Sequence, residues 1–133
     1  MLEFDDKKVV GTATIKKNIT ENDIVCIMVG AFEGGSNYWV GLDNKDKPEW
    51  ETKPKDEPNS TWATKILLEG GSLKFYSLEG DEDDDWILTL DKLIKGFQLN
   101  CENRPHDCDL EQGDAGTCDF ILQYALFGEV VYG

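Results

Sequence analysis

The stretch Gly116-Thr-Cys-Asp-Phe-Ile-Leu-Gln-Tyr-Ala-Leu-Phe-Gly-Glu-Val-Val-Tyr132 is the most apolar part of the chain. Within it, Phe120, Ile121, Tyr124 and Phe127 recur at steps of three and four residues. This spacing is typical of the buried face of a helix. We therefore expect a helix here that forms the centre of the core, and the other elements are expected to pack around it.

Three more helices are indicated upstream. The clearest follows Thr20, a favoured N-cap residue, with Asp23 placed to complete a capping box. An apolar face beginning at Ile24 follows, and Gly34-Gly35 end the run. The other expected helix starts are Ser60 or Thr61 for a second helix that ends at Gly70-Gly71, Thr89 or Asp91 for a third, and Asp114 or Thr117 for the carboxyl-terminal one.

Strand signals lie between the helices. Runs of β-branched and aromatic residues predict strands at 7–19, 37–42, 73–78 and 86–90, with a short terminal strand at Val130-Val131. The element order predicts an α+β fold, a small and mostly antiparallel sheet with about four helices packed against it. A chain of 133 residues is long enough for one domain over residues 1–133.

The charge of the chain limits its partners. It carries 27 acidic and 13 basic residues, a net charge of -14, and Arg104 is its only arginine. Arginine and lysine patches hold phosphates, so direct nucleic-acid binding is not expected. Acidity favours a partner with a basic surface, although it also serves plain solubility. The sequence shows no signal peptide and no membrane-length apolar run, so we expect a soluble, cytoplasmic protein without a membrane partner.

The acidic residues that could contact a basic partner fall in two segments. They are Glu79, Asp81, Glu82, Asp83, Asp84 and Asp85 in a predicted hairpin turn, and Glu102, Asp107, Asp109 and Glu111 in an irregular loop. The alternation of Asp81, Asp83 and Asp85 is found in calcium loops, but Trp86 stands where such a loop needs glycine. A solvated hairpin tip is the default interpretation.

Cys101, His106, Cys108 and Cys118 are the sharpest chemical candidates. Thiolates and an imidazole can hold zinc, but this spacing lacks the C-x2-C pair that presents two sulfurs to one ion. Free thiols and a local disulfide are the alternatives, so zinc stays open and no cofactor is expected. With a single histidine and no phosphate-binding glycine loop or nucleophile elbow, the sequence does not indicate an enzyme.

The aromatic residues Tyr38, Trp39 and Trp50 are candidates for a recognition surface, because exposed aromatics dominate binding hot spots. Tyr38 and Trp39 are neighbours in a predicted strand, so one of them must face inward. Trp50 lies in the proline-rich segment 43–60, where it either pins the loop to the body or is displayed to a partner. We expect Trp50 to be the exposed member.

Three phrases of the sequence are similar to a known family. They are Ala31-Phe-Glu-Gly-Gly-Ser-Asn-Tyr-Trp39, Leu68-Glu-Gly-Gly-Ser-Leu-Lys-Phe-Tyr76 and Asp119-Phe-Ile-Leu-Gln-Tyr-Ala-Leu-Phe-Gly-Glu-Val-Val-Tyr-Gly133. They resemble small proteins encoded by phages and prophages of Gram-positive bacteria, over most of residues 19–133. The resemblance implies a mobile genetic element and brings no activity and no catalytic residues to transfer.

Two functions follow as hypotheses. The first is an acidic, non-enzymatic phage interaction protein that inhibits a host defence or nucleic-acid-binding protein, its carboxylates standing in for phosphates. The alternative is a homo-oligomer that sequesters a small ligand in a pocket between subunits. That pocket would be formed by the two Gly-Gly turns with Tyr38, Trp39 and Phe75.

Overall fold

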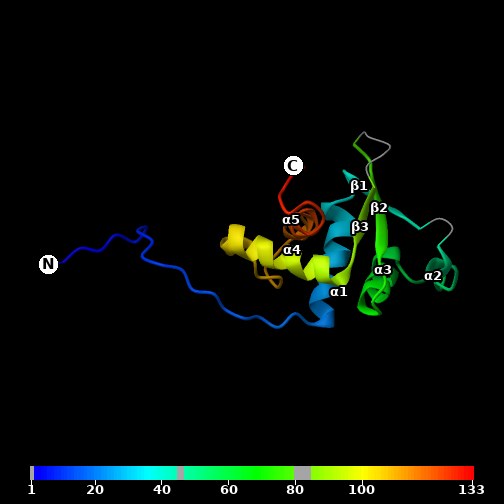
Figure 1. Cartoon of the computed structure of the whole chain (residues 1–133), viewed down its shortest axis with the longest axis horizontal. Helices are drawn as coiled ribbons and strands as arrows, with labels where there is room; N and C mark the ends of the chain where they lie inside the picture. Colours follow the sequence, from blue (N-terminus) through cyan, green and yellow to red (C-terminus); the bar gives the residue numbers. More distant parts are fainter. Residues whose placement is uncertain (1, 45–46, 80–84) are drawn as a thin grey trace.

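The computed structural model describes residues 2–44, 47–79 and 85–133, and its fold is α+β. A three-stranded antiparallel sheet packs against helices (Figure 1). The strands are β1 (Val40–Asp43), β2 (Leu73–Ser77) and β3 (Asp85–Leu88), and the α-helices are α1 (Glu21–Gly30), α2 (Pro48–Glu51), α3 (Asn59–Leu68), α4 (Leu90–Asn103) and α5 (Ala115–Phe127). A π-helical turn, Ala31–Gly35, continues α1, and a short 3-10 turn, Pro105–Asp107, follows α4.

The register of the sheet separates a buried face from an open one. Leu42, Phe75 and Trp86 are cross-strand partners and lie on the inner face. The neighbouring row, formed by Asp43, Lys74 and Ile87, lies on the outer face, because successive side chains of a strand alternate. Phe75 is fully buried, whereas Ile87 is 44% exposed.

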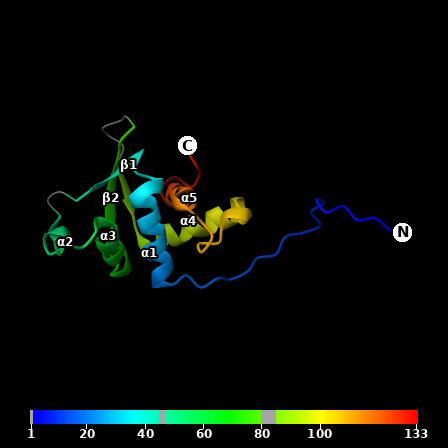
Figure 2. The ribbon, with the colours of Figure 1, turned by 180° about the vertical axis from the view of Figure 1, so that it is seen from behind.

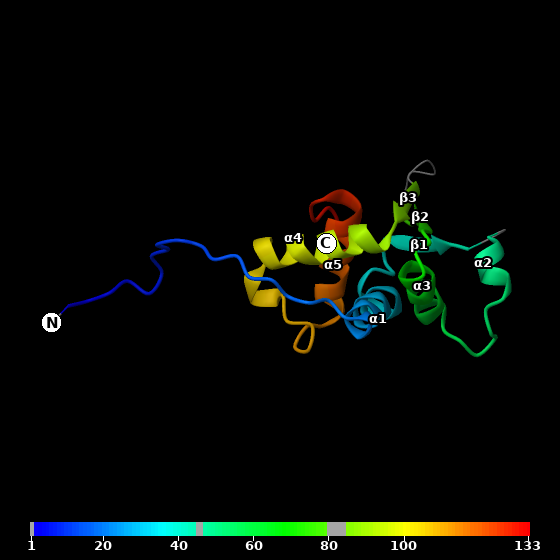
Figure 3. The same cartoon turned by 60° about the horizontal axis from the view of Figure 1, so that its bottom comes forward.

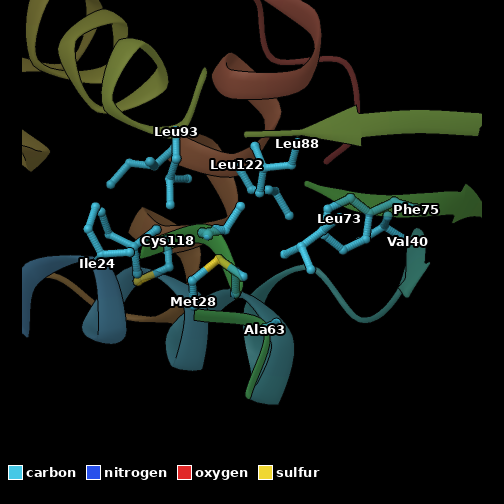
Figure 4. Close-up of a cluster of buried hydrophobic side chains, with 14 of the residues drawn as sticks. Ile24, Met28, Val40, Ala63, Leu73, Phe75, Leu88, Leu93, Cys118 and Leu122 are labelled. Atoms are coloured by element: carbon cyan, nitrogen blue, oxygen red, sulfur yellow. The ribbon is translucent and has the colours of Figure 1, made fainter. Parts of the chain in front are cut away.

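The core lies between the inner face of the sheet and the helices. Figure 4 shows Leu122 of α5 beside Leu88 of β3, and Cys118 of α5 beside Ile24 and Met28 of α1. From behind, α1 lies between the sheet and the pair formed by α4 and α5 (Figure 2).

The carboxyl-terminal helix contacts α4, α1, the π-helical turn and β3, so its expected central place is confirmed. The face that it buries differs from the expected one: Ile121 is buried, but Phe120, Tyr124 and Phe127 are only half-buried, and Cys118 and Leu122 are buried beside Ile121.

Side-chain caps decide where three of the helices begin. Thr20 and Asp23 form the expected capping box of α1, Thr89 caps α4, and Asp114 caps α5. For α3 the expected start at Ser60 or Thr61 is wrong. The helix begins earlier, after Pro58, and the Ser60 hydroxyl instead donates a 3.0 Å hydrogen bond to Glu33.

The strand expected at 7–19 is also wrong. Residues 2–18 are exposed and belong to no helix or strand, and Figures 1 and 3 show them leaving α1 as an extended arm, on the side away from the sheet. A strand needs a neighbouring strand for its backbone hydrogen bonds, and the arm has none beside it. The terminal strand expected at Val130-Val131 is absent as well, because Val131 binds a side chain instead of a strand.

Candidate interaction surface

A buried carboxylate, that of Asp119 on α5, connects the helix to the start of β1. Its side chain accepts hydrogen bonds from the Ser36 hydroxyl at 2.7 Å, from Trp39 Nε1 at 2.7 Å and from the Tyr38 hydroxyl at 3.2 Å. Ser36 and Trp39 are fully buried. Because a buried carboxylate needs donors on its oxygens, this set of bonds fixes the Ser36–Trp39 turn against α5.

The side chain of Gln123, one helical turn after Asp119, holds the carboxyl-terminal segment. Its amide nitrogen donates to Asp119 and to the Tyr132 carbonyl, both at 3.1 Å. Its oxygen accepts from the backbone N–H groups of Val131 and Tyr132, both at 2.8 Å. The Tyr132 ring stacks on Trp39, with 4.7 Å between the ring centroids. All four hydrogen bonds of the buried amide are therefore made within the fold.

This scaffold displays a small exposed surface at the end of the β2–β3 hairpin. Tyr38, Leu78 and Val131 are 44%, 49% and 54% exposed, and Glu79 is exposed beside them. The Leu78 N–H donates to the Trp39 carbonyl at 2.8 Å, next to Tyr38. The pKa of Tyr38 is raised, first by burial, then by the charge of Asp119 and, more weakly, by Glu79. We call these four residues the hairpin-end surface.

The structure places the aromatic candidates in three environments. Trp39 faces inward and Tyr38 is exposed, but both lie in the turn before β1 and not in the strand expected at 37–42, which begins only at Val40. Trp50 is half-buried, so its expected exposure is wrong. It packs against the core from α2, and the bond from Trp62 Nε1 to the Glu49 carbonyl holds that turn in place. Trp50 therefore mainly pins its loop to the body.

Trp50 also lines two hollows. The larger, of about 540 Å³, includes Lys47, Lys53 and Lys55, and the smaller, of about 90 Å³, lies against the outer face of the sheet near Ile87. Neither hollow contains Tyr38, Trp39 or Phe75. Trp39 and Phe75 are fully buried, so the pocket of the sequestration hypothesis is not open in a single chain.

The acidic candidates do not form one patch. Glu79 and Asp85 lie at the end of the β2–β3 hairpin, whereas Asp81, Glu82, Asp83 and Asp84 are outside the described residues. The second group lies at the far end of α4 and in the following loop, and its exposed members are Glu102, Asp109 and Glu111. This group is separated from the hairpin because α4 starts at the opposite end of β3 and runs away from the sheet (Figure 1).

Several of these carboxylates have internal partners. Asp107 is half-buried, accepts a 2.6 Å bond from the Thr117 hydroxyl and pairs with Arg104 at 3.7 Å. Asp85 pairs with Lys74 at 3.4 Å. Exposed pairs of this kind contribute little to stability, but they reduce the charge offered to a partner. Glu79 is exposed at the hairpin end and forms no ion pair with another residue of the described ranges.

The cysteines are divided between two places. The Cys118 thiol faces α1 and donates to the Cys26 carbonyl at 3.6 Å, whereas Cys101 and Cys108 interact with each other near the end of α4. His106 is exposed in the 3-10 turn. Over the part of the chain that the structure describes, no three His, Cys, Asp or Glu side chains gather where they could hold a metal ion. The four residues considered as a possible zinc set are therefore not brought together among the described residues.

The thiols predict how stability depends on pH. Burial raises the pKa of the Cys118 thiol from 9.0 to about 11. The pKa of Cys101 is also raised to about 11, mainly by burial and in second place by the neighbouring Cys108. The folded state then binds protons more tightly than the unfolded state, so stability is lost as pH rises from about 9 to about 11. We expect the Tm to fall over this range.

Thermal unfolding in a series of alkaline buffers, with reducing agent present, measures this loss. Cys118→Ala should lower the Tm at neutral pH but make the alkaline fall shallower, because one of the two perturbed thiols is gone. An alkaline fall as steep in Cys118→Ala as in the parent would contradict the assignment.

No family model, curated protein or solved structure matches the chain. The surface must therefore be interpreted from its own residues. Among the described residues, no helix has the length and apolar character needed to cross a bilayer. Sequence reasoning missed Asp119 and Gln123, although a signal was present: both are polar residues, spaced by four, in the most apolar segment.

Proposed function

We propose that this is a non-enzymatic interaction protein of a phage or prophage, which acts in the host cytoplasm by covering a basic surface of a host protein. Carboxylates at the hairpin end would occupy positions that nucleic-acid phosphates take on that partner. A defence protein or nuclease with a nucleic-acid groove has the required basic surface.

The observation that carries the proposal is the composition of the hairpin-end surface. It combines exposed apolar side chains, Tyr38 and Leu78, with the unburied carboxylate of Glu79. Interfaces commonly join an aromatic anchor to a polar rim. The bond from Tyr38 to buried Asp119 restricts the ring before binding, so less side-chain entropy is lost when a partner docks.

Small-ligand sequestration has weaker support. Its aromatic pocket is closed in a single chain, and the Gly35 backbone packs against Ala115 instead of lining a cavity. The larger hollow near Trp50 is formed by one surface loop and mixes lysines with Glu51. Among the described residues, the buried polar atoms without a hydrogen-bond partner belong to Asn100 and Arg104, and neither residue lines that hollow.

Affinity capture from a Gram-positive host lysate, eluted with a salt gradient, tests the proposal. Glu79→Lys should move elution of a basic, nucleic-acid-binding protein to clearly lower salt, since it replaces an attractive charge by a repulsive one. Glu111→Lys makes the same change in net charge at the far end of α4, and it should elute like the parent protein. A short DNA duplex should compete with the parent protein for the captured partner.

Equal effects of the two substitutions would contradict the role of the hairpin end. Capture that resists high salt, or of partners that do not bind nucleic acid, would contradict phosphate mimicry itself. Leu78→Ser keeps the charge and removes exposed apolar surface, so reduced capture without a change in salt dependence would separate the apolar contribution from the electrostatic one.

A further inference from the structure

The amino-terminal arm, residues 2–18, is exposed along its length and belongs to no helix or strand. Its largest apolar side chains are almost fully exposed, with Phe4 at 85%, Val10 at 93% and Ile15 at 84%. Contact with the body begins only where Lys17 lies over the Phe97 ring, 5.4 Å from its centroid, and where Ile19 packs against the core. Exposed apolar side chains in such a run usually mark a surface that another chain covers.

The pattern of the arm is that of a half-buried strand. Between Lys7 and Lys17, alternate positions give one apolar row and one mainly polar row. The apolar row is Val9, Gly11, Ala13 and Ile15, with Lys7 and Lys17 at its two ends, and the other row is Lys8, Val10, Thr12, Thr14 and Lys16. The segment is thus suited to pairing at a sheet edge, with one side facing a core.

The sheet of the body offers such an edge. Its strand order places β1 and β3 at the edges. On β3, Lys92 Nζ donates to the Ile87 carbonyl at 2.8 Å, so a lysine already covers part of that edge. On the inner side of β1, Leu42 is only half-buried although it packs against the core. A strand added beside β1 would cover Leu42 with its apolar row.

The charges of the two parts are complementary. Residues 7–17 contain four lysines and no acidic residue, in a chain whose net charge is -14. A strand added beside β1 would bring the row that contains Lys8 and Lys16, the lysine-bearing row, to the outer face, where Asp43 and Asp85 flank Lys74. Opposite charges on neighbouring strands are favourable.

A second copy of the chain is the simplest source of a strand that pairs with the β1 edge. The arm joins the amino-terminal end of α1 and extends away from its own sheet, on the same side of the molecule as α4 and α5 (Figures 1 and 3). Exchange of arms between two copies is reciprocal and gives a closed two-fold dimer, in which each arm completes the partner's sheet.

We propose that the protein is a homodimer in which residues 7–17 of each copy add a fourth strand to the β1 edge of the other. The apolar row of the arm covers the core beside Leu42, and the lysine-bearing row meets the acidic outer face. This proposal is independent of the host partner, because the hairpin-end surface lies outside the arm.

Light scattering of the full-length protein after size exclusion tests the assembly. The expected mass is twice the 15.0 kDa of the chain. The double substitution of Val9→Asp with Ile15→Asp places charges on the apolar row, and we expect at least a tenfold weaker dimer. Val10→Asn is the control on the opposite row; it brings no charge toward Asp43 and Asp85 and should stay dimeric. The helical circular dichroism signal of all three should match, since these side chains are exposed within the chain that carries them.

Cross-linking then establishes which chain supplies the strand. Mixed ¹⁴N- and ¹⁵N-labelled protein, treated with a reagent that joins amines to carboxylates, should give mixed-isotope links between arm lysines and Asp43. A monomeric parent protein, a dimer unaffected by the apolar-row substitutions, or links found only within one isotope would each overturn the proposal. The last result would assign the arm to its own sheet.

Discussion

Replacing Asp119 by alanine is expected to lower the free energy of unfolding by about 3–5 kcal/mol. The substitution removes the acceptor of the Ser36 hydroxyl and of Trp39 Nε1, two groups that are fully buried. Each buried donor left without an acceptor loses its hydrogen bond and cannot regain one with water. Such a loss is a large part of the stability of a domain of this size. Chemical denaturation followed by tryptophan fluorescence measures it.

Asp119→Asn separates the hydrogen bonds from the packing. One amide oxygen can still accept from Trp39 and Ser36, but the amide nitrogen would face the donors of Tyr38 and Gln123. We therefore expect an intermediate loss, about 1–3 kcal/mol. Glu129→Ala removes an exposed carboxylate just beyond the carboxyl-terminal end of α5 and should leave stability unchanged within about 0.5 kcal/mol. Equal stability of the alanine variant and the parent would contradict a structural role for the carboxylate.

Replacing Gly96 by alanine is expected to cost about 2–3 kcal/mol, although alanine is the better helix former. A Cβ atom at Gly96 would lie 2.6 Å from the backbone nitrogen of Ala125 and 2.6 Å from the Ile121 carbonyl oxygen. These are backbone atoms of the facing helix α5, so they cannot rotate away as a side chain would. The two helices must separate, and well-packed core contacts are lost along their length.

Gly34→Ala is the matched control for this prediction. A Cβ atom there would come no closer than 3.5 Å to Ala115, which is ordinary van der Waals contact. We expect the control to be neutral or slightly stabilising, since the site is helical. Equilibrium denaturation of both variants gives the comparison. Equal stabilities would show that α4 and α5 can adjust to a methyl group, and the close packing would then be incidental.

Local signals were sufficient to predict most helices from the sequence. The caps at Thr20, Thr89 and Asp114 depend on hydrogen bonds within four residues, so they can be predicted from the local sequence. The strand predicted at 7–19 is wrong for the opposite reason, because its formation depends on contacts outside the segment. Strand propensity at 7–19 describes how the residues would pair, but whether a neighbouring strand is present depends on the direction in which the chain leaves α1.

The candidate site was predictable only in part. One of Tyr38 and Trp39 faces inward, as expected, but both lie in the turn before β1, so the strand alternation behind that expectation does not apply to them. The separation of the acidic residues into two groups follows from the direction of α4, and no local pattern contains that information. Asp119 stands out in the sequence as a polar residue in an apolar segment. Its partner Ser36 is 83 residues away, so no local pattern could indicate their hydrogen bond.

That long separation has a consequence for the order of folding. Helices form in about a microsecond, whereas contacts between distant residues require closure of a long loop first. The hydrogen bond from Trp39 to Asp119, which are 80 residues apart, can form only after α5 and the start of β1 have met. We expect α5 and the sheet to become stable in a single late step. Hydrogen exchange should then show the amides of both regions opening together, as one cooperative unit.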